Sequence, residues 1–536
     1  MAVHASPTGV SAASRTLEEL QFDNSFVREL PGDPEKSNNL RQVFNSFHSP
    51  VAPTPANGEP ALMAASPDVA RLLGLDPAET VRPEFALVMA GAAPLPGGVP
   101  YAQCYGGHQF GNWAGQLGDG RAISIGEVLG PSGDRWELQL KGAGRTPYSR
   151  RADGRAVMRS SVREYVASEA MFALGVPTTR ALSLVSTGDQ VLRDLYYDGN
   201  AAMEPGAVVC RVSPSFVRFG TFELPASRGG EQKKLVQTLL DYVIKHHYPH
   251  HVGKPGAAAA MLKEVAERTA LTVSMWQCLG FVHGVLNTDN MSILGVTIDY
   301  GPYGWMDKFD PFYTPNMTDF QNRRYAYRAQ PEAANWNVMM LANALYAADI
   351  ITEEEAQEAM DAFSTTTEHE YSTRFSAKMG LNTYDKPLIA SLMKLMYEDD
   401  ADFTNTFRSL SRVTVDGSGM PDALVAAFAT ELSDERKVAW NEWLASYRAA
   451  LRAEGRPDAV RAAAQDAANP KFIPRQHLLY NATEGCEKGD PSELASLMKV
   501  LSRPFDEQPK ADSKYSELPP AEMAKKRGVC VLSCSS

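Results

Sequence analysis

Cysteine is scarce in this chain, and long apolar runs are absent. Six Cys in 536 residues do not suggest the disulfide framework of a small secreted protein. No run of about eighteen apolar residues occurs, so the sequence predicts no membrane span. Positive charge is also in the minority, because 52 Lys and Arg against 64 Asp and Glu give a net charge of -12. A broad basic surface for nucleic acid is therefore not expected.

The rest of the composition is that of a large globular protein. Hydrophobic residues make up 44% of the chain and aromatic residues 9%, which is enough for a substantial buried core. A length of 536 residues accommodates two or more ordinary domains, or one large domain built from two lobes.

Both ends of the chain differ in character from the middle. The first seventeen residues contain no acid and several Ser, Thr and Ala, which indicates either an organelle-transit segment or a disordered leader. Near the other end, Cys530 and Cys534 form a C-x3-C pair after the basic run at 525–527. Thiols near positive charge can be reactive, so this pair is a candidate redox site, and an inert tail is the alternative.

Hydrophobic periodicity divides the chain into a strand-rich part and a helical part. Alternation of apolar and polar residues predicts strands over 122–128 and 136–141. Apolar residues at helical spacing predict a helix over 162–174, and helical patterns dominate beyond about residue 230. This order favours an α+β, two-lobed, protein-kinase-like fold with a strand-rich N-lobe and a helical C-lobe.

The same patterns predict four segments. We expect a leader and N-terminal extension over 1–60, a kinase-like N-lobe over 61–225, a helical C-lobe over 226–504 and a flexible tail over 505–536.

One segment resembles an altered kinase catalytic loop. Kinases carry an Asp five residues before a metal-binding Asn, and that Asp accepts the substrate proton. Here the Asn is Asn290, the residue five before it is Val285, and the acid stands directly before it as Asp289. Asp289 is therefore the candidate base, with support of the metal ligands as its alternative role.

A metal-binding Asp-x-Gly follows this loop at Asp299. Asn290 and Asp299 offer the hard oxygen donors that Mg²⁺ or Mn²⁺ prefer. Two short strands, 291–294 and 296–298, are expected to turn at Gly295 and bring these two residues together.

Residues suited to holding a nucleotide precede the catalytic loop. Gly118 and Gly120 flank a turn where the backbone can approach a nucleotide, and Arg121 follows them. Lys141 ends the next strand and Glu164 lies in the following helix, as in the Lys–Glu ion pair of kinases. Each feature is weak alone, but their order along the chain is hard to obtain by accident.

The loop at 142–155 and a later pair of arginines add positive charge. Four Arg in this loop of an acidic protein indicate an anionic ligand such as a triphosphate, with a nucleic-acid patch as the competing interpretation. Arg211 and Arg218 could bind phosphate or form structural ion pairs. The His-rich segment at 246–251 matches no standard zinc spacing and is expected to be a loop.

Several long motifs resemble those of one family. They are YGGHQFG at 105–111, QLGDGR at 116–121, LKGAGRTPYSR at 140–150, HGVLNTDNM at 283–291, DYGPYG at 299–304 and Trp336-Asn337. Over residues 40 to 500 the chain resembles the selenoprotein O family of protein adenylyltransferases, in a Cys-containing form.

The resemblance implies a pseudokinase fold that binds ATP turned around relative to active kinases. Such enzymes transfer AMP to Ser, Thr or Tyr hydroxyls of proteins with Mg²⁺ or Mn²⁺ and release pyrophosphate. For some bacterial members the resemblance also implies the use of UTP with Mn²⁺. By position, the nucleotide-binding residues would be Gly118, Gly120, Arg121, Lys141, Asp153, Gly154, Arg211, Arg218 and Asp299. Asn290 and Asp299 would hold metal, Glu164 would pair with Lys141, and Asp289 would be the base.

The resemblance also extends to the tail and the compartment. Cys534 is third from the end, where some eukaryotic members place selenocysteine. Together with the N-terminal composition this favours a mitochondrial location, with a cytoplasmic one as the alternative. Two other functions stay open, a kinase with Asp289 as a displaced base and a nucleotide-binding scaffold without catalysis.

Overall fold

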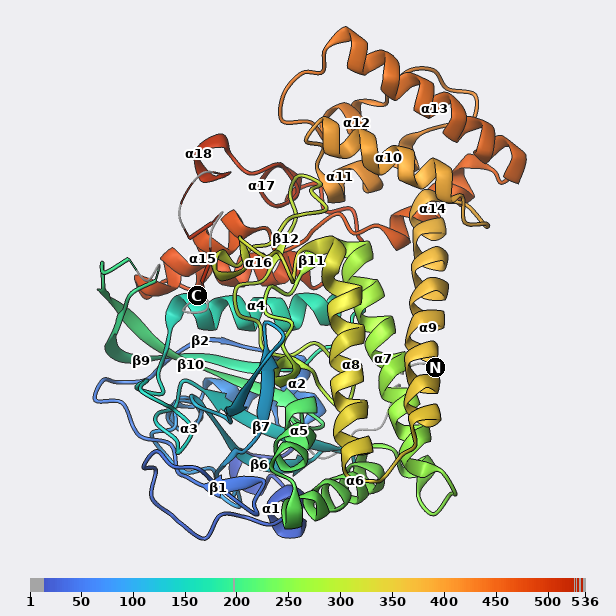
Figure 1. Ribbon diagram of the computed structural model, residues 1–536. Helices are drawn as coiled ribbons and strands as arrows, with labels where there is room; N and C mark the ends of the chain where they lie inside the picture. Colours follow the sequence, from blue (N-terminus) through green and yellow to red (C-terminus); the bar gives the residue numbers. More distant parts are fainter. Residues whose placement is uncertain (1–13, 196–197, 525, 527, 530–531, 534–536) are drawn as a thin grey trace.

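The computed structural model describes residues 14–195, 198–524, 526, 528–529 and 532–533 (Figure 1). The fold is mixed α+β, with the sheet in the N-terminal half and most helices in the C-terminal half. The main sheet has eight strands in the order β1-β3-β6-β7-β10-β9-β2, with β8 paired to β10. Its strands are β1 His48–Pro50, β2 Ala61–Ala65, β3 Tyr101–Gln103, β6 Ala122–Leu129, β7 Arg135–Lys141, β8 Ala156–Val157, β9 Arg180–Arg193 and β10 Ala202–Ser213.

The register of β7 explains how the sheet presents polar groups on one face. Leu138 and Leu140 pack into one apolar cluster, so the alternating residues Gln139 and Lys141 point to the opposite face. On the neighbouring strand β10, Arg211 lies opposite Gln139. These two adjacent strands therefore gather an amide and two cations on one buried face, and the predicted strands at 122–128 and 136–141 are confirmed.

Helix α4 (Met158–Ala173) covers this polar face, in contact with β9 and β10 (Figure 1). Val162, Val166 and Ala170 are fully buried on one side of it, as their helical spacing predicts. The helix ends at Leu174 before Gly175, whose φ of +81° favours glycine.

The C-terminal half is helical. Three of its long helices, α7 (Ala257–Leu279), α8 (Gln330–Ala347) and α9 (Glu353–Met379), contact one another side by side (Figure 1). The others there are α5 Phe219–Arg228, α6 Lys233–His247, α10 Lys386–Glu398, α11 Phe403–Ser409, α12 Asp422–Val425, α13 Asp434–Glu454, α14 Asp458–Ala468, α15 Gln476–Glu487, α16 Ser492–Leu501, α17 Asp512–Tyr515 and α18 Ala521–Ala524. Three short helices lie earlier: α1 Ser25–Glu29, α2 Pro67–Leu72 and α3 Pro83–Met89.

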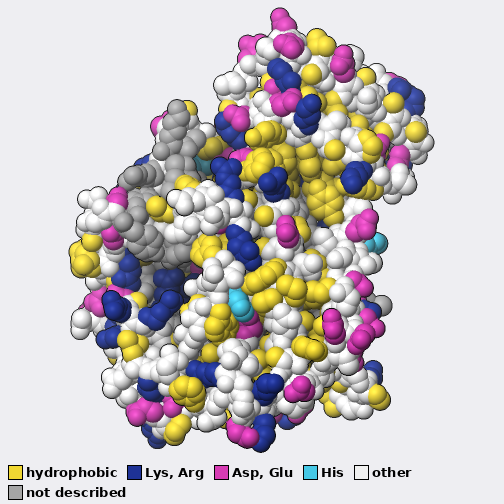
Figure 2. Space-filling view, in the orientation of Figure 1, with side chains coloured by type: hydrophobic (Ala, Val, Ile, Leu, Met, Phe, Trp, Pro, Cys, Tyr) yellow, Lys and Arg dark blue, Asp and Glu magenta, His cyan; other side chains and the backbone are white. Residues whose placement is uncertain are grey.

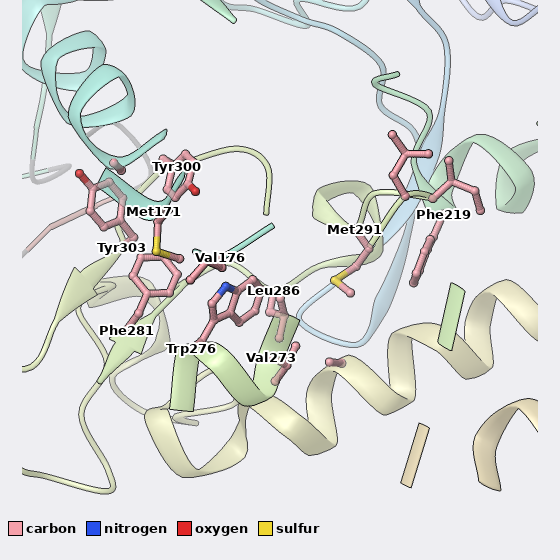
Figure 3. Packing of buried hydrophobic residues seen from close by; sticks show 14 of the residues in the cluster. Met171, Val176, Phe219, Val273, Trp276, Phe281, Leu286, Met291, Tyr300 and Tyr303 are labelled. Carbon is pink, nitrogen blue, oxygen red and sulfur yellow. The ribbon is translucent and has the colours of Figure 1, made fainter. Parts of the chain in front are cut away.

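The largest apolar cluster joins the two halves of the molecule. Met171 of α4 packs in the same cluster as Trp276 of α7 and Phe281, Tyr300 and Tyr303 from the segments around the predicted site (Figure 3). Rings of Phe281 and Tyr303 have centroids 5.8 Å apart, and those of Tyr300 and Tyr303 5.5 Å. The predicted site loops therefore rest on a packed aromatic base.

The predicted pair of strands at 291–294 and 296–298 is wrong. The segment instead makes a turn in which Gly295 N donates to Ser292 O at 3.0 Å. Ser292 pairs with Arg218 and Thr297 pairs with Thr178, so both arms use partners outside the segment. These external partners satisfy the backbone groups that a hairpin would have paired internally.

Other predictions concern the ends of the chain. Cys530 and Cys534 lie outside the described residues, whereas Cys104, Cys210, Cys278 and Cys486 are free thiols in buried positions. Among the described residues, every helix is too short or too polar to span a bilayer. The division at residues 60, 225 and 504 stays a prediction.

Arg163 provides a test of how α4 is joined to the helical half. Its buried guanidinium donates to Gln476 Oε1 at 2.6 Å and to Tyr303 O at 2.7 Å. Arg163→Met should lower the free energy of unfolding by about 3 kcal/mol, because buried acceptors lose a charged donor. Arg163→Lys should not restore it, since an ammonium lacks the forked geometry.

Chemical denaturation measures this effect. Arg412→Met is the matched control, because Arg412 is a partly exposed arginine paired with Asp466 and Glu507, and should cost less than about 1 kcal/mol. Equal midpoints for Arg163→Met and Arg412→Met would contradict the assigned role of Arg163.

Candidate nucleotide and metal site

The catalytic-loop segment is held in place by hydrogen bonds from three directions. The segment follows β11 (Phe281–Val282), which pairs with β12 (Gly304–Trp305). His283 is buried with Nε2 2.8 Å from Ile298 O, and Asn337 of α8 donates to Leu286 O at 2.9 Å. Gly284 has a φ of +80° and lies so close to Pro302 O that a Cβ would approach within 2.3 Å. Glycine is therefore required here by both conformation and space.

Asn290 and Asp299 present the predicted oxygen donors. Asn290 Nδ2 donates to Val285 O at 2.8 Å, and its Oδ1 accepts no hydrogen bond from the described residues. Asp299 has a φ of +57°, an uncommon value for a residue with a side chain, and such strain concentrates at functional sites.

Asp299 lies at the centre of a buried charge cluster. Its two carboxylate oxygens each accept from a different guanidinium, Oδ1 from Arg211 and Oδ2 from Arg218. Burial alone would raise the pKa of Asp299, but the charges of Arg218, Arg211 and Lys141 outweigh it and hold the pKa well below the usual range. Asp299 is therefore ionised at neutral pH.

The predicted Lys–Glu ion pair is present beside this cluster. Lys141 Nζ contacts Glu164 Oε2, and Glu164 Oε1 accepts from Arg211 at 3.0 Å. Glu164 is buried and so links the lysine to the arginine that holds Asp299. Burial lowers the pKa of Lys141 despite the neighbouring Glu164.

Asp289 is buried with one carboxylate oxygen unsatisfied. Oδ2 accepts from Gln109 Nε2 at 3.0 Å, whereas Oδ1 is buried without a partner among the described residues. The Asp289 carbonyl accepts from Arg218 at 2.7 Å, which joins this residue to the Asp299 cluster. Burial raises the pKa of the Asp289 carboxyl to about 6, although Gln109 and Arg218 lower it. Such a carboxylate can accept a proton near neutral pH.

The hairpin of β4 (Gly106–Gln109) and β5 (Asn112–Gln116) fastens Gln109 onto the catalytic loop. His108 N donates to Thr288 Oγ1 at 2.7 Å, and Phe110 N donates to Asn287 Oδ1 at 3.1 Å. Gly107 lies so close to the loop that a Cβ would come within 2.9 Å of Asp289 Oδ1.

The Gly118–Arg121 turn packs closely against the loop that follows it, and its contact with a nucleotide stays a prediction. Gly118 and Gly120 both lie against Tyr148, where a Cβ would approach to 2.5 and 2.9 Å, so these glycines serve close packing of the following loop. Arg121 is half-buried and forms no ion pair with a carboxylate in the described part of the chain. Its guanidinium is therefore available to an anion.

Among the described residues, no hydrogen bond joins Asp153 or Gly154 to the Asp299 cluster. Both oxygens of Asp153 accept from Arg193 at 2.8 Å, and its side chain is 45% exposed. Gly154 has a φ of +72° and pairs through its carbonyl with Gly144 N at 3.1 Å. In the same loop Arg155 donates to backbone carbonyls of Thr54 and Pro55.

Sequence reasoning missed Gln109, Gln139 and Asp119 as site residues. Gln139 accepts from Arg211, and buried Asp119 Oδ1 lies 3.6 Å from Arg218. Burial raises the pKa of Asp119 to about 6, although Arg218 lowers it. Gln109 stands in the YGGHQFG motif and Asp119 in QLGDGR, but neither residue type indicates a role without its partner.

The site combines buried cations and an ionised Asp with an amide oxygen and a carboxyl of raised pKa. This combination is typical of a nucleotide-dependent transferase. A family model described as protein adenylyltransferase SelO matches residues 35–502, and the chain belongs to this family. It is therefore a nucleotidyltransferase that modifies proteins, and the predicted family is confirmed.

The relatives agree over nearly the whole length. Protein nucleotidyltransferase YdiU of Aromatoleum aromaticum is 47% identical, and those of Azoarcus sp. and Xanthomonas campestris pv. campestris are both 49% identical. Each alignment covers 97% of this chain and 100% of the relative. Since these relatives are bacterial, they do not support the mitochondrial expectation.

The raised pKa of Asp289 predicts the pH dependence of protein modification. The ionised carboxylate, which can take a proton, predominates only above its pKa of about 6. AMP transfer should therefore rise with pH through this value and then level off. Gln109→Leu removes a hydrogen bond that lowers the pKa, so its pH–rate profile should move to higher pH.

Gln357→Leu, at an exposed position of α9, is the matched control and should leave the profile unchanged. Identical midpoints for wild type and Gln109→Leu would show that Asp289 does not govern the rate.

Proposed function

We propose that this chain transfers AMP from ATP to Ser, Thr or Tyr hydroxyls of proteins and releases pyrophosphate. We also propose a pseudokinase arrangement, in which the strand-rich half supplies Lys141 and Glu164 and the helical half supplies Asn290 and Asp299. The observation that carries the proposal is the charge cluster around Asp299, joined to Asp289 through Arg218.

The charge balance of the cluster supports binding of a triphosphate. Among the described residues, Glu164 and Asp299 are the carboxylates that pair with Lys141, Arg211 and Arg218, and Asp119 lies 3.6 Å from Arg218. Arg121 adds a further cation without a carboxylate partner among the described residues. Phosphate oxygens would satisfy this excess of buried donors. Asp153 and Gly154, in the loop at 142–155, would bind the nucleotide from the outer side of that loop.

The donor set fits Mg²⁺ or Mn²⁺. Asn290 Oδ1 accepts no hydrogen bond from the described residues, and Asp299 is kept ionised by its cationic neighbours. These two hard oxygens would hold the ion, which supplies charge neutralisation for phosphate oxygens when bound. Arg211 and Arg218 orient the Asp299 carboxylate for that task.

The resemblance implies a reversed nucleotide, with the α-phosphate toward the acceptor. The acceptor oxygen then forms a bond to the α-phosphorus, and the bond between that phosphorus and the oxygen leading to the β-phosphate breaks. Pyrophosphate leaves, and the hydroxyl proton passes to Asp289, whose Oδ1 has no hydrogen-bond partner among the described residues. Val285 cannot take this role, because its side chain has no acceptor.

Nucleotide choice and compartment belong to the same proposal. ATP is proposed as the donor, and UTP with Mn²⁺ is a second donor implied by the resemblance. A cytoplasmic location is the proposed one, in keeping with the bacterial relatives.

Transfer of label from ATP tests the proposed reaction. With this chain and Ser-, Thr- or Tyr-containing peptides as acceptors, α-phosphate label should enter protein and γ-phosphate label should leave in pyrophosphate. Protein labelled from the γ-phosphate would instead establish a kinase, and bound ATP without any transfer would establish a scaffold.

Asp299→Asn tests the metal and phosphate assignment. Loss of the carboxylate charge should lower AMP transfer about 100-fold or more, because the ion loses its charged ligand. Mn²⁺ binding, followed by electron paramagnetic resonance with ATP present, should weaken in parallel. Asp349→Asn, at a surface position paired with Lys233 at 3.7 Å, should change neither. Full activity with undiminished Mn²⁺ binding in Asp299→Asn would overturn the assignment.

A further inference from the structure

The segment between β12 and α8 exposes an unusual group of arginines. Arg323 and Arg328 are exposed and Arg324 is half-buried. None of the three forms an ion pair with a carboxylate among the residues that the structure describes, although the chain has more acids than bases. This contrasts with Arg211 and Arg218, whose charges are met by Asp299.

Aromatic rings, rather than acids, lie next to these guanidiniums. Arg323 and Arg328 lie over the ring of Phe312, at 5.8 and 4.1 Å from its centroid, and Arg324 lies 4.7 Å from that of Trp336. Phe320 beside them is 42% exposed. We call Phe312, Phe320, Arg323, Arg324, Arg328 and Trp336 the arginine–aromatic surface. Arg and aromatic residues are enriched at binding hot spots.

The backbone under this surface is fixed by Asp319. Its buried carboxylate accepts from Arg324 N at 3.0 Å and from Tyr325 N at 2.8 Å. The Asp319 carboxylate therefore serves the backbone and forms no ion pair with Arg323, Arg324 or Arg328. Arg323, with a φ of +50°, turns the chain at this point.

The arginine–aromatic surface is linked to the residues that surround Asp289. Tyr325 OH donates to Asn287 Oδ1 at 2.6 Å and accepts from Phe110 N at 3.0 Å. Trp336 packs edge-on against His108, with centroids 5.4 Å apart. His108 and Phe110 flank Gln109, which donates to Asp289. The surface thus adjoins the side of the site where an acceptor hydroxyl must arrive.

Figure 2 shows how charged and hydrophobic side chains are distributed over one face of the molecule. Dark-blue Lys and Arg side chains lie among yellow hydrophobic side chains in its middle, and few magenta Asp and Glu side chains lie between them. A protein segment that binds here would need negative charge for the guanidiniums and apolar or aromatic groups for the rings.

We propose that the arginine–aromatic surface binds an acidic segment of the acceptor protein and so brings a nearby hydroxyl to Asp289. The inference rests on the proposed AMP transfer and names the acceptor class for it. Charge complementarity favours this occupant, because three guanidiniums without acidic partners attract carboxylates, and ring faces accept the apolar side chains between them.

Three matched peptides test the proposal, each with a single Thr and with flanking residues that are acidic, neutral or basic. Fluorescence anisotropy measures their binding to the full chain, and α-labelled ATP measures transfer. Wild type should bind and modify the acidic peptide about tenfold better than the basic one, and added salt should reduce this difference.

Charge reversal supplies the decisive variant. Arg323→Glu combined with Arg328→Glu should reverse the peptide preference, so that the basic peptide becomes the better acceptor. ATP binding measured by calorimetry should stay unchanged, because both side chains are exposed and outside the Asp299 cluster. Arg452→Glu, an exposed arginine on α13, is the matched control and should keep the wild-type preference.

The outcomes separate this proposal from the proposed reaction. Equal binding of all three peptides by wild type, or an unchanged preference after charge reversal, would overturn the docking surface even with AMP transfer intact. Preferential binding of the acidic peptide without α-label transfer would support the surface and refute the reaction. Loss of RNA binding in the reversed variant, with peptide preference unaltered, would assign the arginines to nucleic acid instead.

Discussion

The buried charge cluster around Asp299 is the constraint on which the rest of the site depends. Two arginines and a lysine hold one carboxylate ionised in a place where burial alone would favour its protonation. Because Glu164 and Gln139 engage the same cations, the cluster joins β7, β10 and α4 to the segment after the catalytic loop. Removing Glu164 or Asp299 would leave a buried cation without its close carboxylate partner, so the ion-pair geometry and the fold support each other.

A second set of contacts connects the Asp299 cluster to Asp289, the candidate base. Arg218 contacts both the Asp299 carboxylate and the Asp289 carbonyl, and the β4–β5 hairpin is hydrogen-bonded to the catalytic loop. Arg218 therefore links the Asp299 cluster directly to the residue proposed as the base. Gln109, between His108 and Phe110 in the hairpin, donates a hydrogen bond that lowers the pKa of Asp289. The same hairpin contacts Tyr325 and Trp336.

Local patterns were sufficient for some of this arrangement. The alternation over 136–141 and the helical spacing over 162–174 predicted β7 and α4, because period-two and period-3.6 patterns depend only on neighbours in the chain. The order of Lys141 and Glu164 along the chain predicted the ion pair that the structure contains, and the roles of Asn290 and Asp299 stay predictions. The strands predicted at 291–298 failed, since Ser292 and Thr297 pair with Arg218 and Thr178, which no local pattern reveals.

The sequence by itself determined the family, the two-part α+β organisation and the identities of the candidate ligand residues, because long motifs and periodicities are properties of adjacent residues. Only the tertiary structure decided that Arg211 and Arg218 share one carboxylate, that Gln109 reaches Asp289, and that Asp153 turns to Arg193. It also decided which arginines form no ion pair with the carboxylates of the described residues. Charge pairing and desolvation depend on distances between residues far apart in the chain, and only packing sets those distances.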